Sequence, residues 1–297
     1  MIRESRQADD PLSGLPVEVA CAVLEVNRGS YYRRPGETGP CAQLDWAGRD
    51  VALRDAIERV VLDFPGYGYR RVTAHLKRDG WKVNRKRVLR VMREESLLCQ
   101  LKRRWTRTTD SEHGLRVYPN LLADCGWRSL TRLDQAWVAD LTYIRLPAGF
   151  CYLAAILDAF SRKVVGWSLS RGIDAALAVA ALEQALAGRQ PGAGWIHHSD
   201  RGVQYACRDY VERLDAAGAQ VSMSAKGTPR ENAQAESFFR TLKHEEVNLS
   251  DYEDYDEAEQ ALGRFIETVY NEKRLHSSLG YRPPSEFEEL FAAGFFH

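Results

Sequence analysis

The chain has 297 residues, 44% hydrophobic and 28% charged, and its 41 Lys and Arg balance 41 Asp and Glu, giving a formal net charge of zero. This composition is ordinary for a globular protein, and the length allows two domains. Residues 1–10 have no signal-peptide core, and no apolar run approaches the roughly 20 residues that span a bilayer. We therefore expect neither a secretory leader nor a membrane span, and a cytoplasmic location.

Charge is distributed unevenly along the chain. Residues 70–107 contain 14 Lys and Arg against three acids, a local charge of +11, so the remainder carries −11. One basic segment in a neutral protein indicates a polyanionic partner such as nucleic acid.

The cysteines are scattered, without a CxxC pair or a zinc signature, at Cys21, Cys41, Cys99, Cys125, Cys151 and Cys207. This pattern indicates reduced, mostly packed thiols.

We expect residues 1–48 to form a helical segment followed by a linker. Residues 15–32 place Val19 and Val23 at helical spacing and can form a small helical hairpin. Residues 33–48 are rich in Pro and Gly, which is typical of a linker.

Residues 49–100 have the pattern of a helix-turn-helix domain. A helical apolar stripe over residues 51–62 ends before Pro65, and a second short helix is predicted over residues 70–78. Asn84 then looks like the N-cap of an Arg-rich helix over residues 85–95. Such a basic helix after a short turn fits a motif whose last helix enters a major groove.

We predict that this domain contacts DNA through Tyr67, Arg70, Arg71, Arg85, Lys86, Arg90 and Arg93. The alternative is a basic face that is merely solvated. The charge asymmetry and the N-cap before the Arg-rich helix favour DNA binding.

Residues 101–130 are polar and weakly patterned, and we interpret them as a linker. Residues 131–297 predict an α/β domain. It begins with three β-rich runs, residues 137–146, 150–157 and 163–169, whose short turns predict an antiparallel meander. An Ala-rich helix over residues 173–186 follows.

Two carboxylates then occur in different local settings. The apolar run Trp195-Ile196 leads to Asp200, which places this acid at the tip of a strand. Glu236 lies in a predicted helix with Thr228 as N-cap. Glu231 completes a capping box with Thr228, so we interpret it as a capping rather than a catalytic residue.

The helix of Glu236 presents two different faces. Arg240 and Lys243 follow Glu236 at i+4 and i+7 and share its face. A neighbouring apolar stripe can pack against a core, and consists of Ala235, Phe239 and Leu242.

A third acid, Asp140, lies in the middle of the predicted strand over residues 137–146, where a charge needs a reason. Several carboxylates brought together can hold two divalent ions about 3.5 to 4 Å apart for phosphoryl transfer. Magnesium suits all-oxygen ligands of this kind. We therefore predict that Asp140, Asp200 and Glu236 are catalytic metal ligands.

Other polar residues near these acids compete for a role. Asp158 also ends an apolar strand, and we assign it a structural or supporting role. His197 and His198 face opposite ways on a strand, so at most one points to the site, and we favour hydrogen-bonded structural roles. Gln204 and Tyr205 can touch DNA.

The C-terminal part contains an apolar helical face over residues 254–270. Lys273, Arg274 and His276 follow and either contact DNA or lie on the plain surface. We expect Pro283-Pro284 to end regular structure.

Five segments resemble, in this order, the OrfB product of the insertion sequence three family of bacterial transposases: WVADLTYIRL, ILDAFSRKVVGW, HHSDRGVQY, ENAQAESFFRTLKHE and NEKRLHSSLGYRPPSEFE. Asp140, Asp200 and Glu236, with thirty-five residues between the last two, are similar to the DDE triad of retroviral-integrase-like transposases. The resemblance covers residues 50–287. The zinc module of retroviral integrases is absent, which favours the bacterial family.

The resemblance implies a ribonuclease H-like core, with a mixed five-stranded sheet flanked by helices, preceded by an all-α helix-turn-helix region. It implies Mg²⁺, with Mn²⁺ as a substitute, and a role for Lys243 in holding a terminal phosphate. The implied partners are DNA, as terminal inverted repeats and target, the upstream-frame OrfA protein, and further copies of the chain.

Two alternatives to a transposase remain at this stage. The first is a non-catalytic DNA-binding remnant or regulator. The second is a nuclease of the same fold that cuts strands without joining them.

Overall fold

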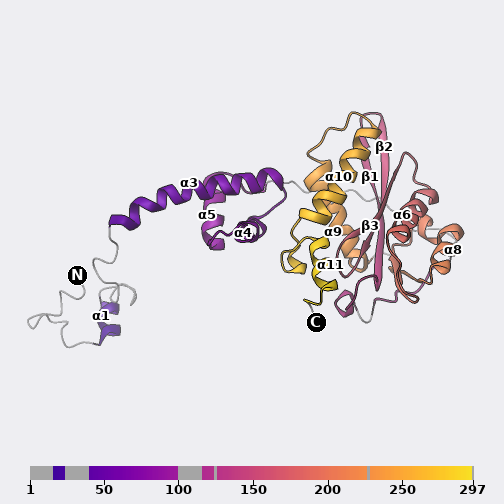
Figure 1. Ribbon diagram of the computed structural model, residues 1–297, viewed down its shortest axis with the longest axis horizontal. Coiled ribbons are helices and arrows are strands. Elements are labelled where there is room, and N and C mark those ends of the chain that lie inside the picture. Colours follow the sequence, from indigo (N-terminus) through magenta and orange to yellow (C-terminus); the bar gives the residue numbers. More distant parts are fainter. Residues whose placement is uncertain (1–15, 24–39, 100–115, 124–125, 226–227, 296–297) are drawn as a thin grey trace, which may run out of the picture. The chain divides into compact units, whose positions relative to one another are not determined.

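The computed structural model describes residues 16–23, 40–99, 116–123, 126–225 and 228–295 (Figure 1). The chain divides into two compact units, Met1–Ala56 and Ile57–His297. Within the described ranges, no helix has both the length and the apolar character needed to cross a membrane.

The first unit contains helix α1 (Val17–Val23) and the beginning of helix α3 (Pro40–Asp63). Because α3 begins at Pro40, the prediction of a linker is wrong for residues 40–48. Proline suits the first position of a helix, where its missing N–H has no partner to lose. The rest of the predicted linker and hairpin, residues 24–39, lies outside the described residues.

The helix-turn-helix region continues with α4 (Tyr69–Arg78) and α5 (Arg85–Glu94). The side chain of Asn84 accepts a hydrogen bond from the Lys86 N–H (2.7 Å), which confirms the predicted N-cap. Gly80 has φ +88°, a left-handed conformation that glycine adopts without steric cost, and it ends α4.

The core of the second unit is a mixed five-stranded sheet. Its strands are β1 (Ala136–Leu146), β2 (Gly149–Asp158), β3 (Val164–Ser170), β4 (Ile196–Ser199) and β5 (Gln220–Met223), in the order β3-β2-β1-β4-β5. The first three form the predicted antiparallel meander, and β4 runs parallel to both β1 and β5. The predicted fold class is confirmed, although β5 is too short and polar to be recognised in the sequence.

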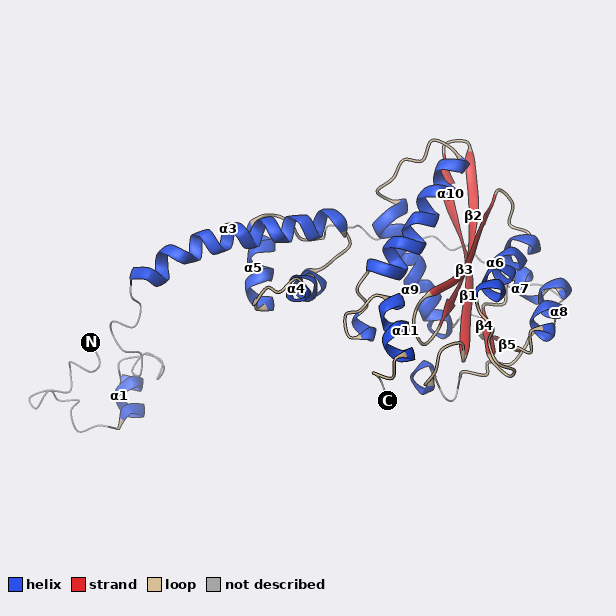
Figure 2. Ribbon diagram, viewed as in Figure 1, coloured by secondary structure: helices blue, strands red, loops and turns tan. Residues whose placement is uncertain are grey.

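Helices cover both faces of this sheet (Figure 2). Trp137 and Ala139 of β1 pack on the side of α6 (Ala175–Gly188), α7 (Val203–Ala206) and α8 (Arg208–Ala216). Val138 and Ile144 pack on the opposite side, with α9 (Ala233–Leu242), α10 (Tyr255–Arg264) and the π-helical η5 (Phe265–Lys273). Neighbouring residues of β1 thus serve different layers.

The start of α9 differs from the predicted capping box. A 3₁₀ turn, η3 (Pro229–Asn232), precedes α9, and the Thr228 side chain caps neither helix. Its hydroxyl donates instead to the Ala225 carbonyl (2.6 Å). Glu231 accepts from the Ala225 N–H (2.6 Å), so it keeps a structural role with a different partner.

The prediction that Pro283-Pro284 ends regular structure is wrong. Helix α11 (Pro284–Ala292) begins there, again because proline is compatible with a first helical turn. Glu288 of α11 is held against the body of the domain. It accepts hydrogen bonds from Arg189 (2.6 Å) and Ser161 (2.6 Å) and pairs with Lys163 (3.3 Å).

Candidate active site

Two of the predicted catalytic acids lie at neighbouring positions of the sheet. Strands β1 and β4 are parallel, and Ala139 pairs with Ser199 at the end of the ladder. The next residues of the two segments are Asp140 and Asp200. Paired residues of adjacent strands lie roughly 4.8 Å apart and face the same side, so the register brings these two carboxylates together.

The third acid comes from α9, on the same face of the sheet. Asp140 continues the side of Val138, which is also the side packed by Ala235 and Phe238 of α9. The amide of Asn232, just before α9, donates to the Ala139 carbonyl (3.1 Å). This bond fastens the N-terminal end of the Glu236 helix beside Asp140.

Burial has the largest effect on the pKa values of Asp140 and Glu236. Burial raises the pKa of Asp140 well above its usual range, and the negative charges of Asp200 and Glu236 raise this pKa further. The Leu141 N–H, which donates to Asp140 (2.8 Å), and Lys243 act in the opposite direction. Partial burial also raises the pKa of Glu236, and Arg240 opposes it.

Lys243 lies at the end of α9, where a π-helical turn, η4 (Lys243–Val247), begins. Its ammonium stands 4.6 Å from the centre of the Tyr143 ring, a cation–π contact. Burial lowers the pKa of Lys243, whereas Asp140 raises it. Lys243, which the sequence predicts at the site, therefore lies near Asp140. Arg240 of the same helix is exposed.

No three His, Cys, Asp or Glu side chains in the described part of the chain are close enough to hold one metal ion, and this includes the predicted triad. The donor chemistry nevertheless fits a divalent cation. Each Asp holds one oxygen on a backbone N–H, Asp140 on Leu141 and Asp200 on Gly202 (2.9 Å). A hard cation would offset the mutual repulsion that raises the pKa of Asp140.

The two histidines that precede Asp200 lie buried among hydroxyl groups. Both are fully buried; His197 contacts the Tyr210 hydroxyl (2.9 Å), and His198 contacts Ser222 (2.9 Å) and Ser224 (3.0 Å). Burial lowers the pKa of His197 to about 3 and that of His198 to about 4. Neutral imidazoles in these bonds support the predicted structural roles.

Asp158 lies away from the other acids and organises a turn. It is fully buried and accepts from the N–H groups of Asp134 (2.6 Å), Phe160 (2.7 Å) and Ser161 (2.8 Å). Burial raises its pKa to about 6. These bonds support the predicted structural role.

Tyr205 does not offer the expected DNA contact, because it is buried. Tyr205 is 1% exposed, and its hydroxyl has no hydrogen-bond partner among the described residues. Burial raises its pKa well above the usual range, and the charges of Asp140 and Asp200 add to this. The Gln204 amide donates to the Ile173 carbonyl (3.2 Å).

The predicted DNA contacts of the helix-turn-helix region fall into two groups. Arg70, Arg85, Lys86, Arg90 and Arg93 are exposed. Five residues of α5 line an open pocket of ≈ 410 Å³, namely Lys86, Leu89, Arg90, Arg93 and Glu94. The exposed cations of α5 can therefore meet a polyanion.

Tyr67 and Arg71 form the second group, and here the structure corrects the prediction. Tyr67 is fully buried, and its hydroxyl accepts from the Leu275 N–H (2.7 Å). Arg71 donates from Nε to the Leu275 carbonyl (3.1 Å). Arg274 and His276 are also buried rather than at a DNA surface, with exposures of 3% and 9%.

Sequence reasoning gave no role to Asn232, Tyr143 or Glu245. Asn232 precedes Glu236 by one helical turn, a spacing that points to the same helix face. Tyr143 and Glu245 carry no sequence signal, because their partners are distant in the chain.

Known families match most of the second unit. The description "HTH-like domain" matches residues 49–105, and two models described as "Integrase core domain" match residues 131–229 and 217–284. The chain is 34% identical over 277 residues to "Transposase InsF for insertion sequence IS3A" of Escherichia coli (strain K12), covering 92% of this chain and 93% of that protein. The chain belongs to the insertion sequence three family of transposases.

A second relative is similar over nearly its whole length. "Insertion element IS600 uncharacterized 31 kDa protein" of Shigella sonnei is 36% identical over 280 residues, which cover 91% of this chain and 98% of that protein. A solved structure with some likeness is "Structure of the HTLV-2 integrase catalytic core domain in complex with magnesium (dimeric form)". It has a TM-score of 0.38 and 15% sequence identity, and the match covers 52% of this chain and 96% of that chain.

Membership of this transposase family confirms the predicted resemblance. Together, the helix-turn-helix and integrase core matches imply DNA binding and, in general terms, polynucleotidyl transfer.

Proposed function

We propose that the chain nicks DNA at the ends of a bacterial insertion sequence and transfers the freed strand to another phosphodiester, with Asp140, Asp200 and Glu236 as the catalytic residues. The observation that carries the proposal is the register of β1 and β4, which sets Asp140 beside Asp200. The bond from Asn232 to Ala139 adds the helix of Glu236 on the same face.

The three carboxylates would hold Mg²⁺, or Mn²⁺ in its place. When bound, such ions activate an attacking oxygen and stabilise the leaving one in phosphoryl transfer. Carboxylate oxygens are the ligands that Mg²⁺ prefers. Glu236 is exposed and has to be held toward the two aspartates, which makes the position of α9 decisive.

Cations beside the acids would bind the DNA. Lys243, next to Asp140 and Tyr143, is suited to hold the terminal phosphate, and exposed Arg240 extends the same helix face. Both give charge-assisted contacts to phosphate oxygens.

We assign residues 49–100 to binding the terminal inverted repeats and residues 131–297 to catalysis. The exposed residues Arg70, Arg85, Lys86, Arg90 and Arg93 would face DNA. An upstream-frame OrfA protein and further copies of the chain would complete the DNA complex, which acts in the cytoplasm. Binding should weaken steeply with salt, because phosphate contacts release counterions.

The test is incubation of the purified protein with labelled DNA carrying the terminal repeat and Mg²⁺. Glu236→Gln should reduce nicked and joined products by more than about 10²-fold, beyond the 10–100-fold typical of residues that only support a metal ligand. Glu231→Gln is the matched control, because this neighbouring acid serves the Ala225 N–H, and it should retain activity.

The same assay separates the alternatives. Binding without cleavage, even with the upstream partner supplied, would indicate a DNA-binding remnant. Nicked strands without joined products would indicate a nuclease. An equal loss of nicked and joined products in Glu231→Gln and Glu236→Gln would contradict a specific catalytic role of Glu236.

A further inference from the structure

A loop in the C-terminal part of the chain connects three parts of the second unit. We call residues 271–286, which run from the last residues of η5 through a short connection into the first residues of α11, the docking loop. At its beginning, the side-chain amide of Asn271 accepts from the Val164 N–H (2.9 Å) and donates to the Val164 carbonyl (3.0 Å). The loop is thereby fastened to the first residue of β3.

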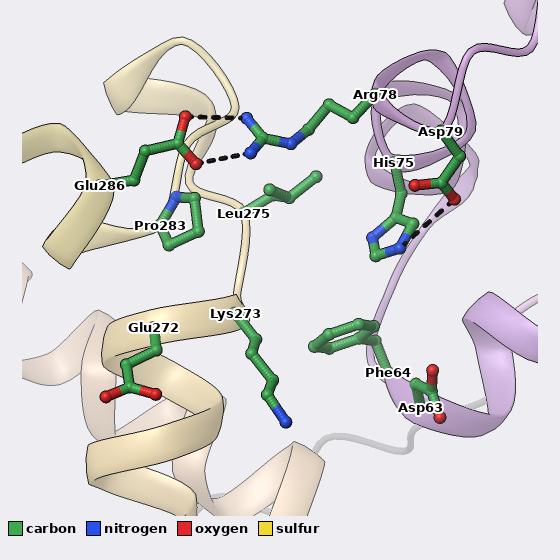
Figure 3. Close-up of a pocket in the computed structure, with 10 residues that line it drawn as sticks. All are labelled: Asp63, Phe64, His75, Arg78, Asp79, Glu272, Lys273, Leu275, Pro283 and Glu286. Atoms are coloured by element: carbon green, nitrogen blue, oxygen red, sulfur yellow. Dashed lines mark hydrogen bonds and ion pairs between the residues drawn. The ribbon is translucent and has the colours of Figure 1, made fainter. Parts of the chain in front are cut away.

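The same loop holds the helix-turn-helix region. Both backbone groups of Leu275 are bound from that side, the N–H by Tyr67 (2.7 Å) and the carbonyl by Arg71 (3.1 Å). Figure 3 shows the outer part of this contact, where the two terminal nitrogens of the Arg78 guanidinium donate to Glu286 (3.1 and 2.5 Å) beside a pocket of ≈ 310 Å³. Helix α4 is therefore docked on the loop by named polar contacts.

The docking loop also binds η4, the helical segment that follows α9. Arg274 forms two hydrogen bonds with Glu245 (2.7 Å each), and the two side chains are only 3% and 5% exposed. Glu245 belongs to η4, which continues α9 without a break. A buried bidentate pair of this kind fixes geometry, and removing one partner strands the other charge.

The helix-turn-helix region touches this pair directly. A Cβ added at Gly66 would come within 2.3 Å of Cγ and Oε1 of Glu245. Glu245 cannot move aside without breaking its bonds to Arg274. The loop before α4 thus fits Glu245 only because residue 66 has no side chain.

Two π-helical segments meet at the pair, one containing Glu245 and the other, η5, ending immediately before Arg274. Such segments are rare and frequent at functional sites. A second contact runs in parallel, because the Phe238 ring of α9 packs edge-on against Tyr270 of η5 (4.9 Å between centroids).

We propose that docking of the helix-turn-helix region on the docking loop sets the position of α9, which makes Gly66, Glu245 and Arg274 positioning residues for Glu236. Asn232 holds the other end of the helix on β1, so Glu236 lies between two fastenings. The catalytic part of this inference rests on the proposed function, whereas the mechanical coupling does not.

The test compares Gly66→Ala with Gly68→Ala in the full chain. Neither glycine has a positive φ, and a Cβ at Gly68 meets no atom within 4 Å, so the second variant is a matched control from the same loop. The readouts are kcat and KM for nicking of repeat DNA, and amide hydrogen exchange over residues 233–247.

Gly66→Ala should lower kcat by about tenfold or more and leave KM within about twofold. It should also speed exchange in residues 233–247, because local opening of that helix becomes easier. Gly68→Ala should have the kcat, the KM and the hydrogen exchange of the wild type. Gly66→Ala with wild-type exchange would overturn the proposal, whatever the activity.

A second variant covers the case in which Gly66→Ala fails to fold. Glu245→Gln keeps the shape of the side chain but removes its charge, and it should also lower kcat and speed exchange. Combined with Tyr67→Phe, its effect should be non-additive, because both act through one set of contacts. Additive effects, or unchanged exchange in Glu245→Gln, would overturn the coupling.

The two proposals can fail separately. If the wild type does not nick DNA but Gly66→Ala still speeds exchange in residues 233–247, the proposed chemistry fails and the coupling stands. If the wild type nicks and joins DNA while Gly66→Ala behaves like the wild type, the coupling fails and the chemistry stands.

Discussion

Helices α4 and α5 have similar sequences, YRRVTAHLKR and RKRVLRVMRE, yet their cations have different partners. Arg71 of α4 binds the Leu275 carbonyl, and Arg78 faces Glu286, so both are engaged by the core of the same unit. On α5, Lys86 and Arg93 are exposed. Two arginines of α4 thus serve internal docking, whereas the exposed cations of α5 are available to a partner.

The difference shows why a charge count identifies a basic segment but not its DNA-reading face. Exposed and docked arginines give the same local net charge. What distinguishes them is whether the folded chain supplies an acceptor, which depends on residues some 200 positions away, such as Leu275 and Glu286. The comparison can be sharpened by separating DNA affinity from stability.

The largest effect is expected on α5. Replacing Lys86, Arg90 and Arg93 by Gln should weaken binding of repeat DNA by about 10²-fold and make its salt dependence shallower by about 2 to 3, because each phosphate contact contributes about 0.9 to the slope. Fluorescence anisotropy over a salt series measures both quantities. The unfolding free energy should hardly change, since these side chains are exposed.

Arg208→Gln is the control for lost charge, because Arg208 is exposed on α8 and pairs only with Glu212 among the contacts described (2.6 Å). This variant should leave the salt dependence of the DNA affinity unchanged. A similar loss of affinity in this variant would mean that overall charge, rather than the α5 face, decides binding.

An intermediate effect is expected on the docked side. Tyr67→Phe leaves the buried Leu275 N–H without its acceptor and should lower the unfolding free energy by about 1–3 kcal/mol. The DNA affinity of the folded protein should remain within about twofold. Chemical denaturation and anisotropy measure the two effects.

Tyr69→Phe is the matched control, since the Tyr69 hydroxyl accepts only from exposed Arg70 (3.3 Å) among the bonds described. Its stability should be close to that of the wild type. Loss of DNA affinity in Tyr67→Phe without loss of stability would restore the DNA contact expected from the sequence.

The smallest effect is expected at Arg78. Its pair with Glu286 is partly exposed, 43% and 31%, and exposed pairs contribute at most about 1 kcal/mol. Arg78→Gln should therefore change stability by less than about 1 kcal/mol and leave DNA affinity unchanged. A marked loss of affinity would place Arg78 on DNA and break the contrast between docked and exposed cations.

Local sequence signals predicted the parts of the fold that depend on local physics. Asn84 caps α5 because its side chain reaches an N–H two residues ahead, and the β-rich runs with short turns form the meander. Strand β5 was missed because Gln220 and Ser222 interrupt its apolar pattern. Thr228 was misread because its hydroxyl binds a carbonyl behind it rather than the helix ahead.

The sequence likewise predicted the acidic residues of the candidate site but not how they come together. Asp140 was found because a charge inside a strand is costly, and Asp200 because it follows an apolar run. Their adjacency required the register of β1 and β4, which no local pattern contains. Asn232 and Glu245 were missed because their partners, the Ala139 carbonyl and Arg274, are brought close only by folding.

Helix α11 limits where the chain can be shortened. The pair Pro283-Pro284 suggests a natural stopping point, but Glu288 beyond it pairs with Arg189 and Lys163 from two other parts of the sheet domain. A stop codon at position 284 would remove the acid that these two cations share, and among the acids described Arg189 would keep only Asp134 (3.3 Å). We expect a copy of the gene truncated there to give an unstable product, although all three predicted catalytic acids would still be encoded.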